Sequence, residues 1–244
     1  MKKKTSFSIL GDSFSTYKGW IPEGYATWYG DGDTNINGVE ETWWHLLMSE
    51  YDLSLLCNCS YSGSTVCMTG YEEITDDAQA FIVRMKDHLG AKDSSAPKPD
   101  ILFVEGGIND TYASPAGMLQ YGDWTEEDLK NALPAYCYML DYLKRYNPDT
   151  RIICMISETV SPELQNGYTE ACRHYHVEYL FFPPKVSDTE LLKDGHPTTK
   201  GHHAIYEAVR TYLESDRVGE CPSLLPAARN SLPEYSAQAV SYSI

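Results

Sequence analysis

The sequence alternates short apolar runs with longer segments in which apolar residues recur at helical spacing. This alternation predicts parallel strands joined by crossover helices. The apolar runs predict strands at residues 6–10, 53–58, 101–105, 151–156 and 177–181. The segments between them predict helices at residues 40–51, 76–89, 125–146, 162–175 and 200–214. Five such units predict an α/β fold, a doubly wound and mainly parallel five-stranded sheet with helices on both faces.

The length of the chain suits one domain of this kind. A chain of 244 residues can bury a substantial core, and we expect a single domain over residues 1–214. Residues 215–244 contain three prolines and show little periodicity. We interpret them as a C-terminal tail that packs on the domain or on a neighbouring subunit.

The charge of the chain excludes several kinds of partner. Nineteen basic residues against 35 acidic ones give a formal net charge of −16. This sign disfavours phosphate backbones and anionic lipid, so we expect neither nucleic acid nor a membrane as a partner. No stretch approaches the ~18 apolar residues of a membrane span, and too few apolar residues follow Lys4 for a signal peptide. We therefore expect a cytoplasmic protein, unless a leader was removed.

The cysteines do not form a recognisable disulfide or zinc pattern. Seven are present, an odd number, and most lie inside apolar segments such as residues 55–59 and 152–154. They are typical of reduced core residues. Because no Cys-x-x-Cys occurs and the pairs His202-His203 and His174-x-His176 are typical of helix surfaces, we expect no metal.

Four residues that could take part in catalysis follow predicted strands or precede the last predicted helix. They are Ser13, Gly63, Asn109 and His196. In an open parallel sheet, ligands bind at the carboxyl ends of the strands, so these residues are expected near one another. Ester hydrolysis by a serine requires such a set, because the hydroxyl needs a base and the tetrahedral intermediate needs hydrogen-bond donors.

With these blocks in this order, the sequence resembles the GDSL-type esterases, also called SGNH hydrolases, over residues 7–214. The matching blocks are Gly11-Asp12-Ser13, the glycine of Ser62-Gly63-Ser64, Gly107-Ile108-Asn109-Asp110, and the His-Pro of Asp194-Gly195-His196-Pro197. The resemblance implies a flavodoxin-like three-layer α/β/α sandwich that hydrolyses carboxylic esters without a cofactor. No Gly-x-Ser-x-Gly elbow is present, which argues against the ordinary α/β-hydrolase arrangement.

The resemblance also assigns roles to residues. Ser13 is the expected nucleophile and His196 the expected general base. The N–H groups of Ser13 and Gly63 and the side-chain amide of Asn109 are the expected oxyanion hole. Because neutral histidine must accept the serine proton, activity is expected to rise with pH through a group that titrates near neutrality.

The acid of the expected triad departs from the family pattern. The family usually places it three residues before the histidine, where this chain has Lys193. Asp194 stands two residues before His196. Either Asp194 reaches the imidazole across a loop one residue shorter, or another group such as a main-chain carbonyl orients it. We expect Asp194 to be the acid.

An aromatic segment, residues 16–35, separates Ser13 from the first long predicted helix. Aromatic faces stack on sugar rings, so Tyr17, Trp20 and Trp28 are candidates for substrate binding. The alternative is that these rings only pack the segment onto the domain. Two acidic residues beside the site, Asp12 and Asp110, are expected to hydrogen-bond loops rather than react.

Three functions follow from this pattern. The first is a serine esterase that removes small acyl groups, acetyl above all, from a carbohydrate or similar polar small molecule. The second keeps the same catalytic residues but acts on a lysophospholipid or an acyl thioester. The third is a glycan-binding module on a hydrolase fold that has lost catalysis, an idea supported by the displaced acid. The expected partner is a small-molecule or carbohydrate ester substrate.

Overall fold

The central sheet has five parallel strands. The computed structural model describes residues 4–31, 35–71, 79–89 and 98–217 of the chain. The strands are β1 (Ser6–Gly11), β2 (Ser54–Asn58), β3 (Ile101–Glu105), β4 (Arg151–Ser157) and β5 (Glu178–Phe182). They pair in the order β2-β1-β3-β4-β5, every pair parallel. The predicted sheet is therefore confirmed, and each predicted strand end lies within one residue of the observed one.

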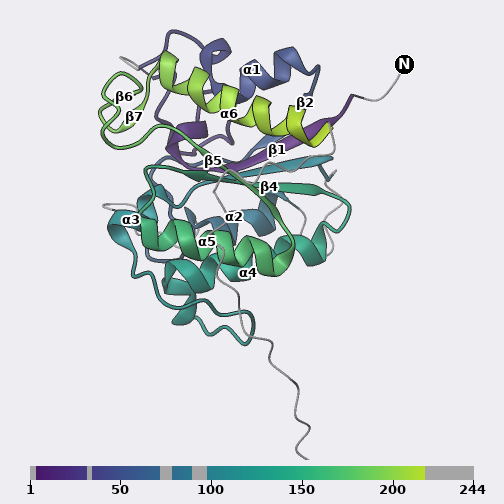
Figure 1. The fold of residues 1–244 in the computed structure, drawn as a ribbon, viewed down its shortest axis with the longest axis vertical. Coiled ribbons are helices and arrows are strands. Elements are labelled where there is room, and N and C mark those ends of the chain that lie inside the picture. The colour runs from purple at the N-terminus through teal and green to yellow at the C-terminus, as the bar shows by residue number, and fades with distance from the viewer. Residues whose placement is uncertain (1–3, 32–34, 72–78, 90–97, 218–244) are drawn as a thin grey trace, which may run out of the picture.

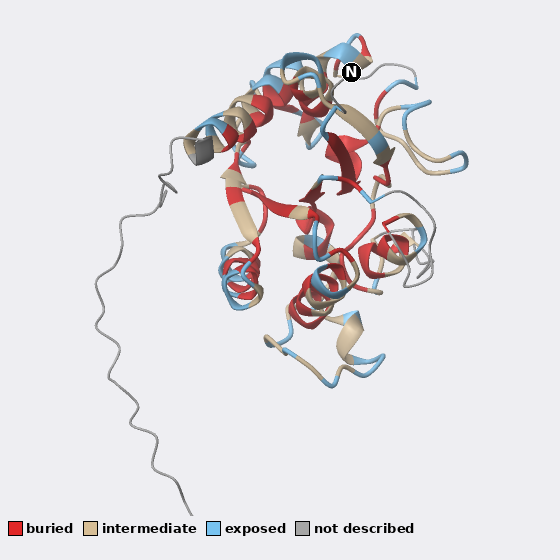
Figure 2. Ribbon diagram, turned by 90° about the vertical axis from the view of Figure 1, so that its right-hand side faces the viewer, coloured by how far each residue is buried: buried red, intermediate tan, exposed pale blue. Residues whose placement is uncertain are grey.

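Helices cover both faces of the sheet (Figure 1). The helices α1 (Trp43–Glu50) and α6 (Thr199–Arg217) lie together on one face. The helices α2 (Phe81–His88), α4 (Ala132–Tyr146) and α5 (Pro162–Tyr175) lie on the other. The buried residues lie on the inner sides of these layers, as the ribbon coloured by burial shows (Figure 2). The result is a three-layer α/β/α sandwich.

The prediction of one helix over residues 125–146 was wrong at its start. The structure has a short 3-10 turn at Asp128–Lys130, an extended Asn131, and then α4. Pro134 explains the late start, because a proline that lacks an N–H fits the first turn of a helix and breaks its interior. The predicted helix at 40–51 is likewise shorter, since a 3-10 turn at Val39–Glu41 precedes α1. Residues 76–78, the start of the predicted helix 76–89, lie outside the described residues.

The order of the strands determines where a ligand can bind. From β1 the chain first forms β2 on one side and then crosses to β3 on the other. Such a reversal leaves a crevice outside the carboxyl ends of the two strands at which it occurs, here β1 and β3. The first of these ends leads into Ser13 and the second into a short helix, α3 (Ile108–Ala113), that contains Asn109.

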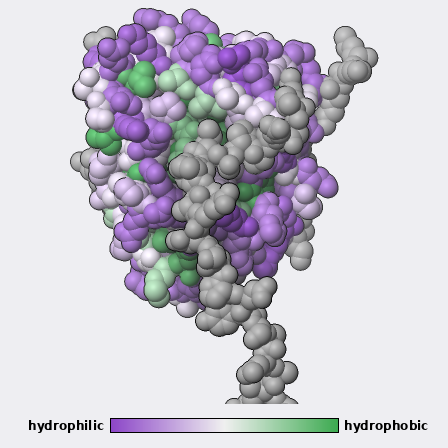
Figure 3. All heavy atoms as spheres, in the orientation of Figure 1, coloured by the Kyte–Doolittle hydropathy of each residue, from purple (hydrophilic) through white to green (hydrophobic). Residues whose placement is uncertain are grey.

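The face shown in Figure 3 is mostly hydrophilic, with hydrophobic side chains in small separate groups. No helix within the described ranges is both long enough and apolar enough to cross a membrane.

The helix α6 continues to Arg217, three residues past its predicted end, and the remainder of the predicted tail lies outside the described residues.

Candidate active site

Ser13 begins a 3-10 turn directly after β1. The preceding Asp12 caps this turn, since its Oδ1 accepts a hydrogen bond of 3.1 Å from the Phe14 N–H. The strand ends at Gly11, where a Cβ atom would lie 2.5 Å from Ser60 Oγ. A larger residue at position 11 would therefore push the loop that contains Ser60 away from the end of β1.

A buried carboxyl pair lies behind Ser13. Asp12 and Glu105 are both fully buried, and Glu105 Oε2 accepts a hydrogen bond of 2.8 Å from the Ser15 hydroxyl. Burial raises the pKa of Glu105 to about 7. Burial and then the charge of Glu105 raise the pKa of Asp12 well above its ordinary value. At least one of the two is therefore expected to be protonated at neutral pH.

A buried arginine fastens the loop that contains Gly63. The guanidinium of Arg84, from α2, donates to the carbonyls of Gly11 and Cys59 and, at 2.8 Å, to Ser64 Oγ. Arg84 is fully buried, and burial lowers its pKa to about 10, so it keeps its charge at neutral pH. It joins the end of β1 to both ends of the 59–64 loop. Sequence reasoning missed this residue, because nothing in a helical pattern marks an inward-facing arginine.

Asn109 faces the same loop from α3. Its side-chain Nδ2–H donates to the Ser64 carbonyl at 2.9 Å. The next residue, Asp110, accepts hydrogen bonds from the N–H groups of Val66 and Cys67 at 2.8 and 3.3 Å. The expectation that Asp110 bonds a loop is confirmed, as it is for Asp12.

The main-chain N–H groups of Ser13 and Gly63 are candidate hydrogen-bond donors to a substrate. Within the described residues, no hydrogen bond uses the N–H of Ser13 or the N–H of Gly63. Gly63 has a φ of +80°, a left-handed conformation that turns the backbone sharply after Ser62. Free N–H groups at strand ends can stabilise a negative oxygen.

His196 reaches Ser13 from the far end of the chain. It lies in a two-stranded antiparallel hairpin, β6 (Leu192–Lys193) and β7 (His196–Pro197). The two residues between these strands, Asp194 and Gly195, have φ values of +52° and +75°. Positive φ at both central positions is what a type I′ turn requires, and Asp-Gly is a strong signal for it. That signal in the sequence could have predicted the hairpin.

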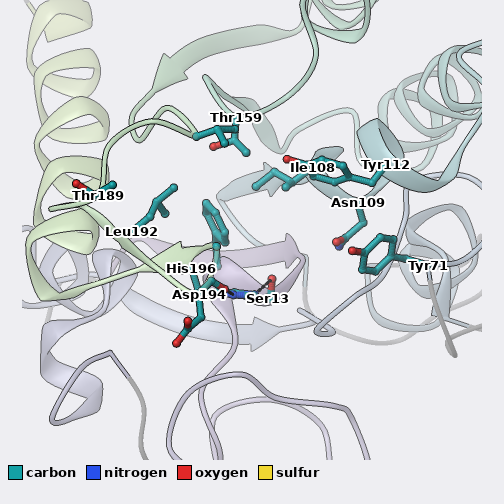
Figure 4. A pocket seen from close by; sticks show the side chains of 13 residues that line it. Ser13, Tyr71, Ile108, Asn109, Tyr112, Thr159, Thr189, Leu192, Asp194 and His196 are labelled. Carbon is teal, nitrogen blue, oxygen red and sulfur yellow. Dashed lines mark hydrogen bonds between the residues drawn. The ribbon is translucent and has the colours of Figure 1, made fainter.

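The histidine makes two contacts. Its Nε2 lies 2.9 Å from Ser13 Oγ, and its Nδ1 lies 2.8 Å from the main-chain carbonyl of Asp194. A carbonyl can only accept, so Nδ1 carries the proton and Nε2 is free to accept one. The Asp194 side chain is exposed and points away from the Ser13–His196 pair in Figure 4. The contact that we expected from its carboxylate comes from its main chain, because the tight turn directs that carbonyl at the ring.

The aromatic segment holds the hairpin. The ring of Trp28 stacks on His196 with centroids 3.5 Å apart and planes 10° from parallel. Tyr29 Oη donates to the Pro197 carbonyl at 2.9 Å, and Asn35 Nδ2 donates to the carbonyls of Lys193 and His196 at 2.8 and 3.0 Å.

Burial lowers the pKa of His196 to about 4, although the hydrogen bond to the Asp194 carbonyl acts to raise it. The imidazole is therefore neutral through the physiological range.

The site opens into a cavity of about 490 Å³. Figure 4 shows Ser13, Asn109, Asp194 and His196 around it. The other lining residues are a mixture of aromatic, aliphatic and hydroxyl side chains: Phe14, Tyr71, Ile108, Tyr112, Thr159, Val186, Thr189, Leu192 and Gly195. A lining that mixes ring faces and aliphatic side chains with hydroxyl, amide and imidazole groups suits a small molecule that carries polar groups.

The three aromatic candidates for substrate binding do not line this cavity. Trp20 packs against Trp44 and His45, with ring centroids 5.5 and 5.7 Å apart. Tyr17 packs against the hydrophobic core. Trp28 covers a face of His196. Besides Phe14, the aromatic rings that line the cavity are Tyr71 and Tyr112, which come from later segments that sequence reasoning did not single out.

Comparison with known proteins agrees with this geometry. Residues 5–213 match the model of the GDSL-like lipase/acylhydrolase family. A crystal structure from Bacteroides ovatus, named as a GDSL-like lipase, is 32% identical with a TM-score of 0.77, covering 88% of this chain and all of the other. One from Bacteroides uniformis, named likewise, is 37% identical with a TM-score of 0.76, covering 86% of this chain and 96% of the other.

More distant structures share the fold alone. An acetyl xylan esterase from Butyrivibrio proteoclasticus is 17% identical with a TM-score of 0.59, covering 90% of this chain and 66% of the other. No curated protein matches the chain.

Proposed function

Because the chain belongs to the GDSL-like lipase/acylhydrolase family and is an ester hydrolase, we propose that Ser13 is its nucleophile and His196 its general base. One observation carries this assignment. Ser13 Oγ lies 2.9 Å from the unprotonated nitrogen of an imidazole whose other nitrogen is held by a carbonyl. This is the geometry and tautomer that proton transfer from serine requires.

The first half of the reaction follows from this pair. Ser13 Oγ attacks the acyl carbon of the ester while its proton passes to His196 Nε2. The negative oxygen that develops would accept hydrogen bonds from the Ser13 N–H, the Gly63 N–H and the Asn109 amide. Their support is that the two main-chain donors have no partner among the described residues and that Asn109 lines the cavity beside Ser13.

The second half returns the enzyme to its starting state. The imidazolium gives its proton to the leaving alkoxide, and the acyl group stays on Ser13. A water molecule then loses a proton to His196 Nε2 and attacks the acyl carbon. The tetrahedral intermediate expels Ser13 Oγ, which takes the proton back from the imidazolium, and the carboxylic acid leaves. The stacked ring of Trp28 holds the imidazole in place through both proton transfers.

The pair acts as a Ser-His dyad supported by a carbonyl. A carboxylate on Nδ1 would stabilise the imidazolium by its full charge, whereas a carbonyl offers only a dipole. The carbonyl of Asp194 still fixes the ring and its tautomer. The base function thus survives the displacement of the acid, which is why we prefer an enzyme over a non-catalytic glycan-binding module.

The proposed substrate is a small acyl ester, such as an acetyl ester, of a carbohydrate or similar polar molecule. Tyr71 and Tyr112 at the cavity offer faces on which a sugar ring can stack, and Thr159 and Thr189 offer hydroxyl groups. The fold shared with an acetyl xylan esterase suggests the same class of substrate to test.

One observation favours the second candidate, a longer acyl chain on a lipid or a thioester. Phe14, Ile108, Val186 and Leu192 form an apolar part of the lining. Nitrophenyl acetate, butyrate and octanoate would separate the two candidates, together with release of acetate from acetylated xylan. Highest kcat/KM with acetate and release from the polysaccharide would support the first. A preference for octanoate would support the second.

A fluorophosphonate probe tests the nucleophile independently of the substrate. The wild-type protein should be labelled at Ser13, as mapped by peptide mass spectrometry, and Ser13→Ala should not be labelled. Ser62→Ala, a serine change in the adjacent loop, should keep the label. Absence of label on Ser13 in folded wild-type protein would contradict the proposed function.

A further inference from the structure

Three metal-ligating side chains meet outside the active site. The Sγ atoms of Cys57 and Cys59 and a ring nitrogen of His88 all lie within 4.8 Å of one another. We propose that these residues bind a thiophilic divalent cation, Zn²⁺ above all. Thiolate and imidazole are the ligands that this ion prefers. The proposal is independent of the esterase assignment.

The fold brings these residues together from two elements. Cys57 lies in the edge strand β2, and Cys59 directly follows its last residue. Because successive side chains of a strand alternate in direction, residues two positions apart point to the same side, and the two sulfurs are adjacent. The pairing of β2 with β1 shifts register between Leu55 and Cys57, which marks a bulge. Bulges re-aim side chains next to functional sites. His88 is the last residue of α2.

A fourth residue orients the imidazole. Tyr25 Oη lies 2.6 Å from His88 Nε2. A histidine that binds a metal through one nitrogen almost always uses the other in such a hydrogen bond. With the cation at Nδ1, the Nε2–H would donate to Tyr25 Oη. The tyrosine thus does for this site what the Asp194 carbonyl does for His196.

Charge and space also suit a divalent ion. Two thiolates neutralise its charge, which matters because the Arg84 guanidinium binds the Cys59 carbonyl nearby. The two sulfurs are 2.8 Å apart, and around a tetrahedral zinc they would stand roughly 3.8 Å apart. Rotation of the half-buried Cys57 side chain can provide this difference. A water molecule can complete the tetrahedron, because Cys57 and His88 are both partly exposed.

Titration with Co²⁺ tests the proposal. The full-length protein would be treated with a chelator and a phosphine reductant, freed of both, and titrated while its visible spectrum is recorded. We expect one Co²⁺ per chain, with the thiolate charge-transfer and tetrahedral ligand-field bands that Zn²⁺ then abolishes. At a hundred times the dissociation constant, Zn²⁺ should raise the Tm by about 5–10 °C. Wild-type protein without these bands would overturn the proposal.

Variants assign the ligands. Cys57→Ser, Cys59→Ser and His88→Gln should each weaken Co²⁺ binding by about 100-fold or more. The matched controls Cys67→Ser and His45→Gln change the same residue types elsewhere and should bind as the wild type does. Bands that persist unchanged in all three ligand variants would place the ion elsewhere and refute the assignment.

Alkylation needs no variant. Zn²⁺ should protect Cys57, the partly exposed thiol of the pair, from iodoacetamide, as read by peptide mass spectrometry. Because the two sulfurs are adjacent, the pair could instead form a disulfide. A Cys57–Cys59 disulfide in the isolated protein, with no uptake of Co²⁺ after its reduction, would also refute the proposal.

Discussion

The two sides of the proposed active site are built differently. On the nucleophile side, Ser13 and Asn109 follow two central strands and stand beside the fully buried Asp12 and Asp110. On the base side, His196 lies in a hairpin whose strands have two residues each. The first side is held by the sheet and by buried charges, the second by a turn and by the aromatic segment.

This difference predicts which side of the site tolerates a substitution without disturbing the fold. Removing a buried carboxyl or Arg84 would disturb the fold as well as the site, because unpaired buried charges are costly. The hairpin can lose one contact and keep its turn, since Asp194 and Gly195 determine the turn locally. Changes on the nucleophile side should therefore abolish chemistry, and changes on the base side should reduce it in steps.

The largest effect is expected for Ser13→Ala. Removal of the nucleophile should lower kcat by roughly 10⁴-fold or more, because only the oxyanion donors and binding remain. Steady-state hydrolysis of nitrophenyl acetate measures this, and a thermal melt checks the fold. Residual activity within tenfold of wild type would remove Ser13 from the chemistry.

The next largest effect is expected for Asn109, whose side-chain amide is the proposed oxyanion donor on the nucleophile side. Asn109→Ala should lower kcat by about 10²–10³-fold and leave KM nearly unchanged, because the donor acts mainly in the transition state. Asn109 also bonds the Ser64 carbonyl, so the melt must show that the loop remains folded. A change confined to KM would mean that Asn109 binds substrate and does not stabilise the oxyanion.

On the base side, Trp28→Leu should lower kcat by about tenfold, because the imidazole loses the ring that positions it. The acid limb of the pH profile should also move up from about 4 toward 6.5, because loss of the stacked ring exposes one face of the imidazole and burial lowers the His196 pKa. Trp20→Leu is the matched control, as Trp20 packs away from the cavity. Equal effects of the two changes would show that Trp28 acts only through stability.

A smaller effect is expected for Asp194→Asn. The main-chain carbonyl that contacts His196 is retained, and asparagine tolerates the positive φ of this position. The kcat should therefore stay within about threefold of wild type, whereas loss of a triad carboxylate costs about 10⁴-fold. A loss of that size in folded protein would restore the Ser-His-Asp assignment that we expected from the sequence.

The smallest effect concerns pH. A base with an ordinary pKa near 6.5 would lose about tenfold in kcat/KM between pH 7.5 and 5.5, because only the neutral form accepts the proton. With the His196 pKa near 4, the loss should stay below about twofold. The pKa of Glu105, raised to about 7, lies inside this window, so Glu105→Gln is measured alongside. A limb near neutrality in both proteins would contradict the burial of His196.

Much of the site could be predicted from the sequence, because its parts follow local signals. Each buried strand is a short apolar run, and Ser13, Gly63 and Asn109 lie in the loops and short turns that follow strands whose carboxyl ends meet at one edge. The Asp-Gly turn before His196 is an equally local signal. Strand positions and the residues at their ends were therefore predictable to within a residue or two.

Only the tertiary structure decided the contacts between distant segments. The carbonyl rather than the carboxylate of Asp194 meets His196, Trp28 stacks on that ring instead of lining the cavity, and Arg84 points inward to the loop. The meeting of His88 with Cys57 is of the same kind. The physical reason is that side-chain direction and burial depend on packing between elements, and packing sets both the geometry and the pKa of each group.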